Sequence, residues 1–511
     1  MADPRKQIGE RFEKQPFQNF GNIIRKMVVR GVRCHTDTVI NILNPITAIS
    51  GLNGTGKSTL LQLAASAYRG EQALTGRPFS VSDFIVRGAL DARPFREDAA
   101  IEYTFETTKD EDGKQVSAKN LTISYSSQDQ RWEGYDRRPK RNVFFGGIGM
   151  FLPRSERPND YVFQNAERMK VAETVELAEE VRTWSARILN CGYEKIAKNH
   201  LKYRTRQEHV LSTQSNGNDY SESHMGCGEG RVQSMLAQLE SLPPQSLILL
   251  EEPETALHPD AEYNLGTYLI DLCNRKSHQI FITTHSHMLL RSLPPKSLIY
   301  LHRENGKVEA IAGLSSAQAS SLMAQGYEKA LTILVEDRAA EIVLYEILRH
   351  FDNAFARTVG IVIAGSIGAD GRPKAGGKDA IRNTLISLSR ATHFNIAAVL
   401  DGGELADPKH YIFKLPGDFP PEAALFQCPA VREFLDRNYQ ELDMKAIETE
   451  FENADCHDYF KRLGRIVGCE EDFLIRESAR CYAPQAGATE VKALVDLLKD
   501  AASKNTRRNP S

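Results

Sequence analysis

The sequence lacks any long apolar run. No stretch approaches the roughly 20 consecutive apolar residues that a membrane-spanning helix needs. The segment from Met1 to Lys14 is polar and charged, without the apolar core of a secretory signal. Because the composition, 41% hydrophobic and 26% charged, is otherwise that of an ordinary globular chain, we expect a cytoplasmic protein with no membrane partner.

The sequence also lacks a cysteine pattern and a strong net charge. Its eight cysteines are scattered without a CxxC pair, which indicates neither a zinc site nor a disulfide framework. The formal net charge of -3 gives no overall attraction to nucleic acid. Any contact with DNA therefore needs a local basic patch.

The length and the apolar pattern predict several domains of the α/β class. At 511 residues the chain exceeds the roughly 100 to 200 residues of a typical domain. Short apolar runs at 246–250, 280–284 and 298–301, with helical patterns between them, predict βαβ units and a mostly parallel sheet. A second α/β series begins near residue 331. We predict a first domain over 1–315, a smaller α/β domain over 326–420, a helical region over 421–502 and a disordered tail over 503–511.

The first domain is expected to contain an insertion between its strands. Residues 165–206 lack strong helix breakers apart from Gly192, so we interpret them as a helical insertion. The polar stretch 212–222 that follows is typical of a loop. Alternating apolar residues elsewhere predict strands at 23–33 and 39–49, and a hairpin formed by 101–105 and 121–125 around the polar turn 109–113.

The clearest motif in the chain is the glycine-rich loop from Gly51 to Ser58, which lies between an apolar strand and a helical pattern. Its three glycines let backbone NH groups and a helix N-terminus surround phosphate oxygens. In such a loop Lys57 reaches the β- and γ-phosphates, and Ser58 binds Mg²⁺. The predicted ligands are therefore ATP and Mg²⁺, with contacts from Asn53, Gly54, Thr55, Gly56, Lys57, Ser58 and Thr59.

Two carboxylates end the apolar run at 247–250, and parallel sheets bind ligands at the carboxyl ends of their strands. Glu251 is predicted to hold the Mg²⁺ shell, and Glu252 to orient and deprotonate the attacking water. A second apolar strand ends at His285, which is predicted to contact the γ-phosphate or the water, although a lone histidine is also typical of a structural role. The sequence thus predicts an ATP hydrolase with Glu252 and His285 as catalytic residues.

Four motifs in this order resemble ABC-type P-loop ATPases of the SMC-like and OLD (overcoming lysogenization defect) branch. The resemblance covers roughly residues 20–300 and extends to the ATPase subunits of bacterial anti-phage defence systems such as Septu, PARIS and retron-linked systems. It implies an ABC-type ATPase head with the helical insertion, followed by a smaller Toprim-like α/β domain and a helical C-terminus. The matching phrases are Gly51 to Thr59, Gly226 to Glu229, Leu249 to Pro259 and Thr283 to Ser286.

The resemblance also implies a signature loop at Met225 to Glu229, which in this family completes the ATP site of a second protomer. Its implied nucleotide contacts are Gly226, Gly228 and Glu229. A homo-oligomer is therefore expected, at least a dimer of heads that closes around two ATP molecules.

The chain departs from the family pattern at two positions of the head. Gly226 stands where a serine commonly touches the γ-phosphate, which leaves that contact to backbone NH groups and implies slow hydrolysis. Glu251 stands where aspartate is commoner. No residue is assigned as the Q-loop glutamine, although Asp83 lies in the right region.

Glu336 and Asp401, each at the end of an apolar run, resemble the two acidic strand ends of a Toprim domain, the metal-dependent nuclease module of OLD proteins. Such nucleases need a glutamate and a paired Asp-x-Asp to hold Mg²⁺. Here Gly403 occupies the second aspartate position, so we expect a degenerate domain in which Glu336 and Asp401 are the remaining metal-ligand candidates. Glu404 would substitute only if the loop shifted by one residue, and the weaker candidates are Asp337, Asp407 and Lys414.

Two basic segments are candidates for DNA contact. The segment from Arg131 to Arg141 carries five basic side chains around Trp132 and Tyr135, a pattern that tracks phosphates and stacks on bases. The second, Lys198 to Arg206, lies at the end of the proposed insertion. Such runs are also typical of solvated hairpins, and both suit an acidic protein partner equally well.

These observations leave two classes of function. In the first, the protein is an ATP-gated subunit of a bacterial anti-phage defence complex that controls a separate nuclease or toxin subunit. In the second, it is an OLD-like endonuclease that cuts DNA through Glu336 and Asp401 under ATP control. The missing aspartate at Gly403 favours the first. A housekeeping SMC-like ATPase is disfavoured, because the insertion at 165–206 is too short for the long coiled coil of such proteins.

Overall fold

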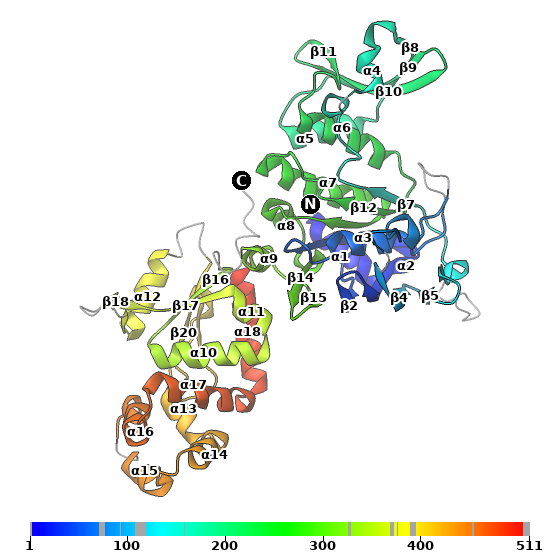
Figure 1. The fold of residues 1–511 in the computed structure, drawn as a ribbon. Helices are drawn as coiled ribbons and strands as arrows, with labels where there is room; N and C mark the ends of the chain where they lie inside the picture. Colours follow the sequence, from blue (N-terminus) through cyan, green and yellow to red (C-terminus); the bar gives the residue numbers. More distant parts are fainter. Residues whose placement is uncertain are drawn as a thin grey trace. The chain divides into compact units, whose positions relative to one another are not determined.

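The chain forms two compact units in the computed structural model, and each unit is described by itself. They comprise Met1–Ala319 and Ser320–Ser511, and Figure 1 colours them along the sequence from blue to red. The expected turn at 109–113 and residues 504–511 of the expected tail lie outside the described residues. The structure describes residues 3–70, 77–91, 94–107, 119–157, 159–324, 329–367, 373–375, 377–388, 395–451 and 454–503.

A six-stranded sheet forms the core of the first unit. Its strands are β3 (Ile46–Gly51), β7 (Val143–Gly146), β12 (Leu247–Glu251), β13 (Gln279–Thr283), β14 (Leu298–Glu304) and β15 (Lys307–Ala312). The order is β15-β14-β3-β13-β12-β7, and every pair is parallel except β15 with β14. The predicted parallel sheet is therefore confirmed.

Helices cover both faces of this sheet, which explains why its strands are continuous apolar runs. In Figure 1, α3 (Lys57–Ala65) lies on one face and α7 (Pro259–Lys276) on the other. Helix α8 (His287–Ser292) packs on α7, and α6 (Cys227–Glu240) lies beside the insertion. The shorter outer helices are α1 (Pro4–Lys14), α2 (Pro16–Phe20), α4 (Tyr161–Gln164) and α9 (Ser316–Met323).

A five-stranded antiparallel sheet packs against helix α3. It consists, in spatial order, of β2 (His35–Asn41), β1 (Ile24–Val32), β4 (Phe95–Phe105), β5 (Asn120–Ser126) and β6 (Arg131–Glu133). The Tyr103 hydroxyl of β4 donates to the Leu63 carbonyl of α3 at 2.7 Å, so this sheet fixes the position of the helix. The expected hairpin is confirmed by the antiparallel pairing of β4 with β5.

The single strand expected over 39–49 is two strands in different sheets. Strand β2 ends at Asn41 and β3 begins at Ile46. Pro45 has no backbone NH for a sheet ladder, and the Asn44 side chain accepts a hydrogen bond from the Ile46 NH at 3.1 Å. The prediction was wrong about continuity and right that a strand enters the glycine-rich loop.

The segment expected to be a helical insertion, 165–206, contains strands as well as a helix, so the prediction of an all-helical insertion was wrong. It contains β8 (Lys170–Glu176), α5 (Glu179–Leu189) and β9 (Lys195–Tyr203), which continue into β10 (Arg206–Ser215) and β11 (Asn218–Ser221). The four strands form an antiparallel sheet in the order β11-β10-β9-β8 (Figure 1). An absence of helix breakers does not distinguish a helix from a strand, because pairing with a neighbouring strand decides the outcome.

The stretch 212–222, which we expected to be a loop, belongs largely to β10 and β11. The turn between these strands is Asn216-Gly217, and both residues have positive φ, 50° and 74°. An Asn-Gly pair favours the tight hairpin turn that needs two positive φ angles. We predicted a loop because the stretch is polar, and the Asn-Gly turn within it was not taken into account.

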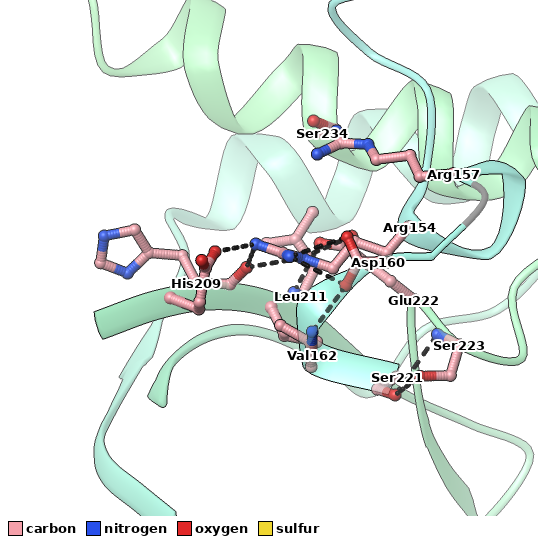
Figure 2. Close-up of polar contacts among 12 residues, drawn as sticks. Arg154, Arg157, Asp160, Val162, His209, Leu211, Ser221, Glu222, Ser223 and Ser234 are labelled. Atoms are coloured by element: carbon pink, nitrogen blue, oxygen red, sulfur yellow. Dashed lines mark hydrogen bonds and ion pairs between the residues drawn. The ribbon is translucent and has the colours of Figure 1, made fainter. Parts of the chain in front are cut away.

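A buried arginine, Arg154, ties the insertion to the chain on either side of it (Figure 2). Its guanidinium forms ion pairs with Asp160 at 3.1 Å, Glu208 at 2.9 Å and Glu222 at 3.9 Å. It also donates to the His209 carbonyl of β10 at 2.8 Å. Because three carboxylates surround this one cation, the position of the insertion depends on it.

Replacing Arg154 by alanine should destabilise the insertion. The change leaves partly buried carboxylates without their cation, which typically costs about 3–5 kcal/mol. We expect a lower first transition in calorimetry and faster hydrogen exchange in β10. The control is Arg157→Ala, because Arg157 is exposed and its side chain donates to the Leu152 carbonyl. Equal exchange in the two variants would contradict this role of Arg154.

A four-stranded parallel sheet forms the centre of the second unit. Its strands are β16 (Leu331–Val335), β17 (Val359–Ile363), β20 (Ile396–Leu400) and β21 (Ile412–Lys414), in the order β17-β16-β20-β21. Because β16 and β20 are neighbours, the residues that follow them meet at one edge. The connecting elements include α10 (Arg338–Phe351), α11 (Asn353–Thr358), α12 (Gly377–Leu388) and the antiparallel pair β18 (Gly365–Ile367) and β19 (Pro373–Ala375).

The helices beyond residue 420 share a hydrophobic core with this sheet. Leu435, Phe460 and Leu498 belong to the same buried cluster as Ile333 of β16 and Leu344 of α10. The helical region and the sheet are therefore packed as one body. The helices are α13 (Pro421–Gln427), α14 (Pro429–Asn438), α15 (Met444–Phe451), α16 (Tyr459–Val467), α17 (Glu471–Tyr482) and α18 (Ala488–Ala502).

Two features expected from composition can be checked directly. Within the described residues, no helix is both long enough and apolar enough to span a membrane. All eight cysteines are free thiols, and Cys273 and Cys428 are buried.

Candidate functional site

The glycine-rich loop connects β3 to α3, in the strand, loop and helix order that the sequence predicts. Gly51 has φ +146°, and a Cβ there would lie 2.6 Å from the Leu301 carbonyl oxygen. Gly56 has φ +85°, and a Cβ there would lie 2.3 Å from the His35 ring. Gly54, with φ +79°, instead borders open space. All three glycines thus have a left-handed φ, two of them also leave no space for a Cβ, and Gly54 leaves room above the centre of the loop.

The Lys57 side chain lies across this loop. Its ammonium donates to the carbonyl oxygens of Gly51 at 3.0 Å and Leu52 at 3.2 Å. Burial lowers the Lys57 pKa, and the charge of Glu252 opposes that shift. The ammonium is therefore already held within the loop, where phosphate oxygens can replace the carbonyls as acceptors.

Glu251 ends the buried strand β12 beside the beginning of α3. Its Oε1 atom is buried and has no hydrogen-bond partner among the described residues. Burial raises the Glu251 pKa, whereas a hydrogen bond with Ser58 lowers it. An orphaned carboxylate oxygen next to a hydroxyl fits a hard cation such as Mg²⁺. Ser58 and Glu251 are thus brought together as predicted.

Glu252 occupies a strained backbone position next to His285. Its φ is +41°, which is unusual for a residue other than glycine and is typical of functional sites. The Glu252 NH donates to the Thr283 carbonyl at 3.0 Å, which ties this turn to β13. His285 Nε2 lies 3.7 Å from Glu252 Oε1. Burial and the Lys57 charge lower the His285 pKa, so the imidazole is neutral near pH 7.

Glu254 stabilises this turn, a role that its place in the matching phrase did not predict. It is buried, and its Oε1 accepts from the Thr284 hydroxyl at 2.5 Å and the His285 NH at 3.1 Å. Burial raises the Glu254 pKa. The carboxyl group therefore fixes the backbone that carries His285.

Arg231 is a second residue that sequence reasoning missed. It lies on α6, is only 2% exposed, and donates to the Ile148 carbonyl at 2.6 Å and the Glu252 carbonyl at 3.3 Å. Burial lowers its pKa. Through this side chain the helix that follows the signature loop holds the backbone of Glu252. Its position, two residues after Glu229 inside an amphipathic helix, gave no signal of that contact.

The signature loop lies at the beginning of α6, with Gly226 as the residue before the first turn. A Cβ on Gly228 would lie 2.7 Å from the Ala256 carbonyl oxygen, so glycine allows the loop to approach the turn after β12. Glu229 Oε1 accepts from the hydroxyls of Tyr193 at 2.9 Å and Tyr220 at 2.7 Å. Two tyrosines around the insertion therefore hold Glu229.

Asp83, the residue in the expected Q-loop region, belongs to a local network. Its described partners are Arg77, at 2.6 Å, and Ser80, whose NH donates to it at 2.7 Å. The contacts lie within residues 77–83 and cap a short 3-10 helix. They do not join Asp83 to the glycine-rich loop.

Part of the first basic segment, a candidate for either DNA contact or a solvated hairpin, packs within the fold. Trp132 is 6% exposed and packs on Phe95, so its ring has no free face for a base. Arg138 donates to the Phe79 carbonyl at 2.7 Å, and the buried Arg141 to the Asn22 carbonyl at 2.7 Å. The second segment, 198–206, forms part of β9 and its turn rather than a helix end.

The second unit brings Glu336 and Asp401 together at the ends of β16 and β20. The Asp401 NH donates to Glu336 Oε1 at 3.4 Å. Asp401 Oδ1 is buried without a partner among the described residues, and burial together with the Glu336 and Asp337 charges raises the Asp401 pKa to about 7. A cavity of about 440 Å³ beside the pair is lined by Glu336, Asp337, Gly377, Asp401, Gly403, Glu404, Pro420 and His457.

Glu404, Asp407 and Lys414 have partners other than Glu336 and Asp401. Glu404 pairs with Lys378 at 3.1 Å, and Asp407 pairs with His410 at 2.7 Å on the surface. Lys414 donates to the Gly402 and Gly417 carbonyls at 2.9 and 3.0 Å, which fixes the loop after β20. Glu404 thus does not replace the missing aspartate beside Asp401.

The fold and the site of the first unit define a P-loop nucleotide-binding unit. A family model described as an AAA ATPase domain matches residues 156–290, which include Glu251, Glu252 and His285. The matched residues lie within the first unit, and ATP and Mg²⁺ are the ligands expected of such a domain. A search of curated proteins found no match.

Solved structures of SMC heads are also similar to this chain. The SMC head domain from Thermotoga maritima is 14% identical, with 57% of this chain and 98% of that chain covered and a TM-score of 0.34. An Smc head domain with an extended coiled coil, bound to the C-terminal domain of ScpA and derived from Pyrococcus furiosus, is 12% identical, with 57% and 96% covered and a TM-score of 0.38.

Replacing Arg231 by methionine should slow ATP hydrolysis without weakening ATP binding. The guanidinium holds the Glu252 backbone, and its described hydrogen bonds do not reach the glycine-rich loop. We therefore expect kcat to fall by up to about a hundredfold, while KM for ATP stays within error. Steady-state ATPase kinetics measure both. Gln238→Ala on the same helix is the control, and Arg231→Lys should recover part of kcat. A raised KM with an unchanged kcat would contradict this role.

Proposed function

We propose that the first unit is an ABC-type MgATPase. Lys57 binds the β- and γ-phosphates, Ser58 and Glu251 hold Mg²⁺, and Glu252 acts as the general base on the attacking water. His285 contacts the γ-phosphate or that water. The observation that carries the proposal is the meeting of Lys57, Glu252 and His285 at one edge of a parallel sheet, with His285 Nε2 3.7 Å from Glu252 Oε1.

We further propose that two heads close around two ATP molecules. The signature loop supports this arrangement, because Gly226 precedes a helix N-terminus and a Cβ there would meet no atom within 4 Å. Backbone NH groups at such a terminus bind phosphate without a side chain. In this proposal the loop donates to the γ-phosphate of the partner protomer, and Arg231 couples that contact to Glu252.

The Glu252→Gln variant tests the catalytic assignment. The amide cannot accept a proton from water, so kcat should fall by about 10²–10⁴ while ATP binding remains. In the presence of ATP, this variant should then accumulate as a closed dimer, which light scattering after gel filtration detects. The control Glu309→Gln removes an exposed carboxylate from β15 of the same sheet and should behave as the parent. Hydrolysis by Glu252→Gln at the parent rate would reject the general base.

We also propose that the ATPase acts in the cytoplasm as a subunit of a bacterial anti-phage defence complex, where its nucleotide state controls a separate nuclease or toxin. Two features of the second unit favour an effector in trans. Gly403 offers no ligand beside Asp401, and the nearby Glu404 is paired with Lys378. The alternative, an ATP-regulated endonuclease of the OLD type, is supported by the contact between Asp401 and Glu336.

Plasmid cleavage distinguishes the two. The purified chain is incubated with supercoiled plasmid, ATP and either Mg²⁺ or Mn²⁺, with and without the products of neighbouring genes. We expect cleavage only when such a product is present, because the acid pair lacks its third carboxylate. Cleavage by the chain alone that disappears in a Glu336→Ala, Asp401→Ala double variant would select the endonuclease.

A further inference from the structure

Three potential metal ligands from separate parts of the second unit converge beside the acid pair. Asp337 precedes α10, Glu422 lies in the first turn of α13, and His457 lies in a 3-10 helix at Cys456–Asp458. One ligand atom from each of these residues lies within 4.8 Å of the others. None of the sequence motifs pointed to Glu422 or His457.

Glu422 is the most informative member of this cluster. It is 4% exposed, although glutamate is rarely buried without a partner. Its Oε1 lies 3.3 Å from His457 Nδ1, whereas its Oε2 is buried with no hydrogen-bond partner among the described residues. A simple Glu422–His457 ion pair therefore leaves one buried oxygen unsatisfied, which is costly in a protein interior.

The charges around the cluster also favour a bound cation. Of the ionisable residues that line the adjoining cavity, four are carboxylic acids and one is a histidine. Lys378, whose charge acts on Glu336, pairs with Glu404. Asp401 Oδ1 is a second buried carboxylate oxygen without a partner among the described residues. Buried carboxylates are stable when they are paired with a cation or coordinate a metal.

We propose that Asp337, Glu422 and His457 form a binding site for a divalent transition metal, with Mn²⁺ or Zn²⁺ as the class of ion. The cation satisfies the free oxygen of Glu422 and neutralises the surrounding carboxylates. A set of two carboxylates and one imidazole suits Mn²⁺, Fe²⁺ or Zn²⁺, because Mg²⁺ prefers oxygen ligands alone. Water and the carboxylates of Glu336 and Asp401 are available to complete the coordination. The site goes beyond the proposed ATPase and does not depend on it.

His457 also lies close to Asp455 and Cys456, which together form an alternative group of potential ligands. That group is largely exposed. It contains no buried oxygen that lacks a partner among the described residues. The buried Glu422 therefore favours the first set.

Metal binding by the full, nucleotide-free chain tests the proposal. Protein freed of metal with a chelator is titrated with Mn²⁺, and the loss of the free Mn²⁺ resonance is followed by electron paramagnetic resonance. Loss of an outer-shell partner alone weakens metal binding by about 10–100-fold, so Glu422→Gln and His457→Ala should each lose at least that much affinity. Glu251→Gln should retain the ion, which excludes the nucleotide site. His410→Ala removes the surface histidine paired with Asp407 and should also retain it.

Four outcomes would overturn the site. These are failure of Mn²⁺ and Zn²⁺ to bind the parent protein, loss of binding in Glu251→Gln, parent-like binding by His457→Ala, and loss of binding in Cys456→Ser while Glu422→Gln keeps it. Circular dichroism checks that each variant is folded. If Glu422→Gln does not fold, the His457→Ala variant decides the result, because His457 is half-exposed. Zn²⁺ should raise the melting temperature of the parent, EDTA should reverse that rise, and His457→Ala should not show it.

Discussion

The parallel pairing of β3, β13 and β12 is the constraint on which the nucleotide site depends. In this register Ile282 of β13 lies opposite both Ala48 of β3 and Leu250 of β12, so the three strands end at one edge of the sheet. The glycine-rich loop, the carboxylates of Glu251 and Glu252, and His285 lie at these ends. A slip of one residue would turn the side chains of a strand to the opposite face and separate them. Contacts that hold the register, such as the Glu252 NH with the Thr283 carbonyl, are therefore also contacts of the site.

Buried arginines connect this edge to the rest of the first unit. Arg231 joins the signature helix to the Glu252 backbone, and Arg154 joins the insertion to the segment that leads to the signature loop. Tyr193 and Tyr220 then hold Glu229 within that loop. Guanidinium groups suit such positions because one planar cation satisfies several acceptors at once. Polar contacts thus link the insertion, the signature loop and the turn that carries Glu252.

The second unit also carries its candidate site residues at the ends of neighbouring parallel strands, but acidic side chains predominate there. Its acidic residues also follow neighbouring parallel strands, but the Lys378 ammonium beside them pairs with Glu404, whereas the Lys57 ammonium lies within the glycine-rich loop. Burial raises the pKa of Asp401 to about 7, which reflects carboxylates crowded together in a poorly solvated place. A bound metal ion would relieve this crowding, and His457 gives the cluster a nitrogen ligand. The unit can therefore depend on a cation even if it does not cut DNA.

The sequence by itself determined the parts of the protein that local chemistry controls. An apolar strand followed by glycines, lysine and serine can be recognised without knowledge of neighbouring strands, and the same holds for the apolar run before Glu251 and Glu252. The tertiary structure decided everything that depends on distant partners. Strand pairing made the insertion a sheet, and burial turned Arg138 and Arg141 toward backbone carbonyls instead of phosphates. Arg231, Glu254 and Glu422 gained their roles only through folding, because a buried charge acts through the groups that surround it, and those groups come from other parts of the chain.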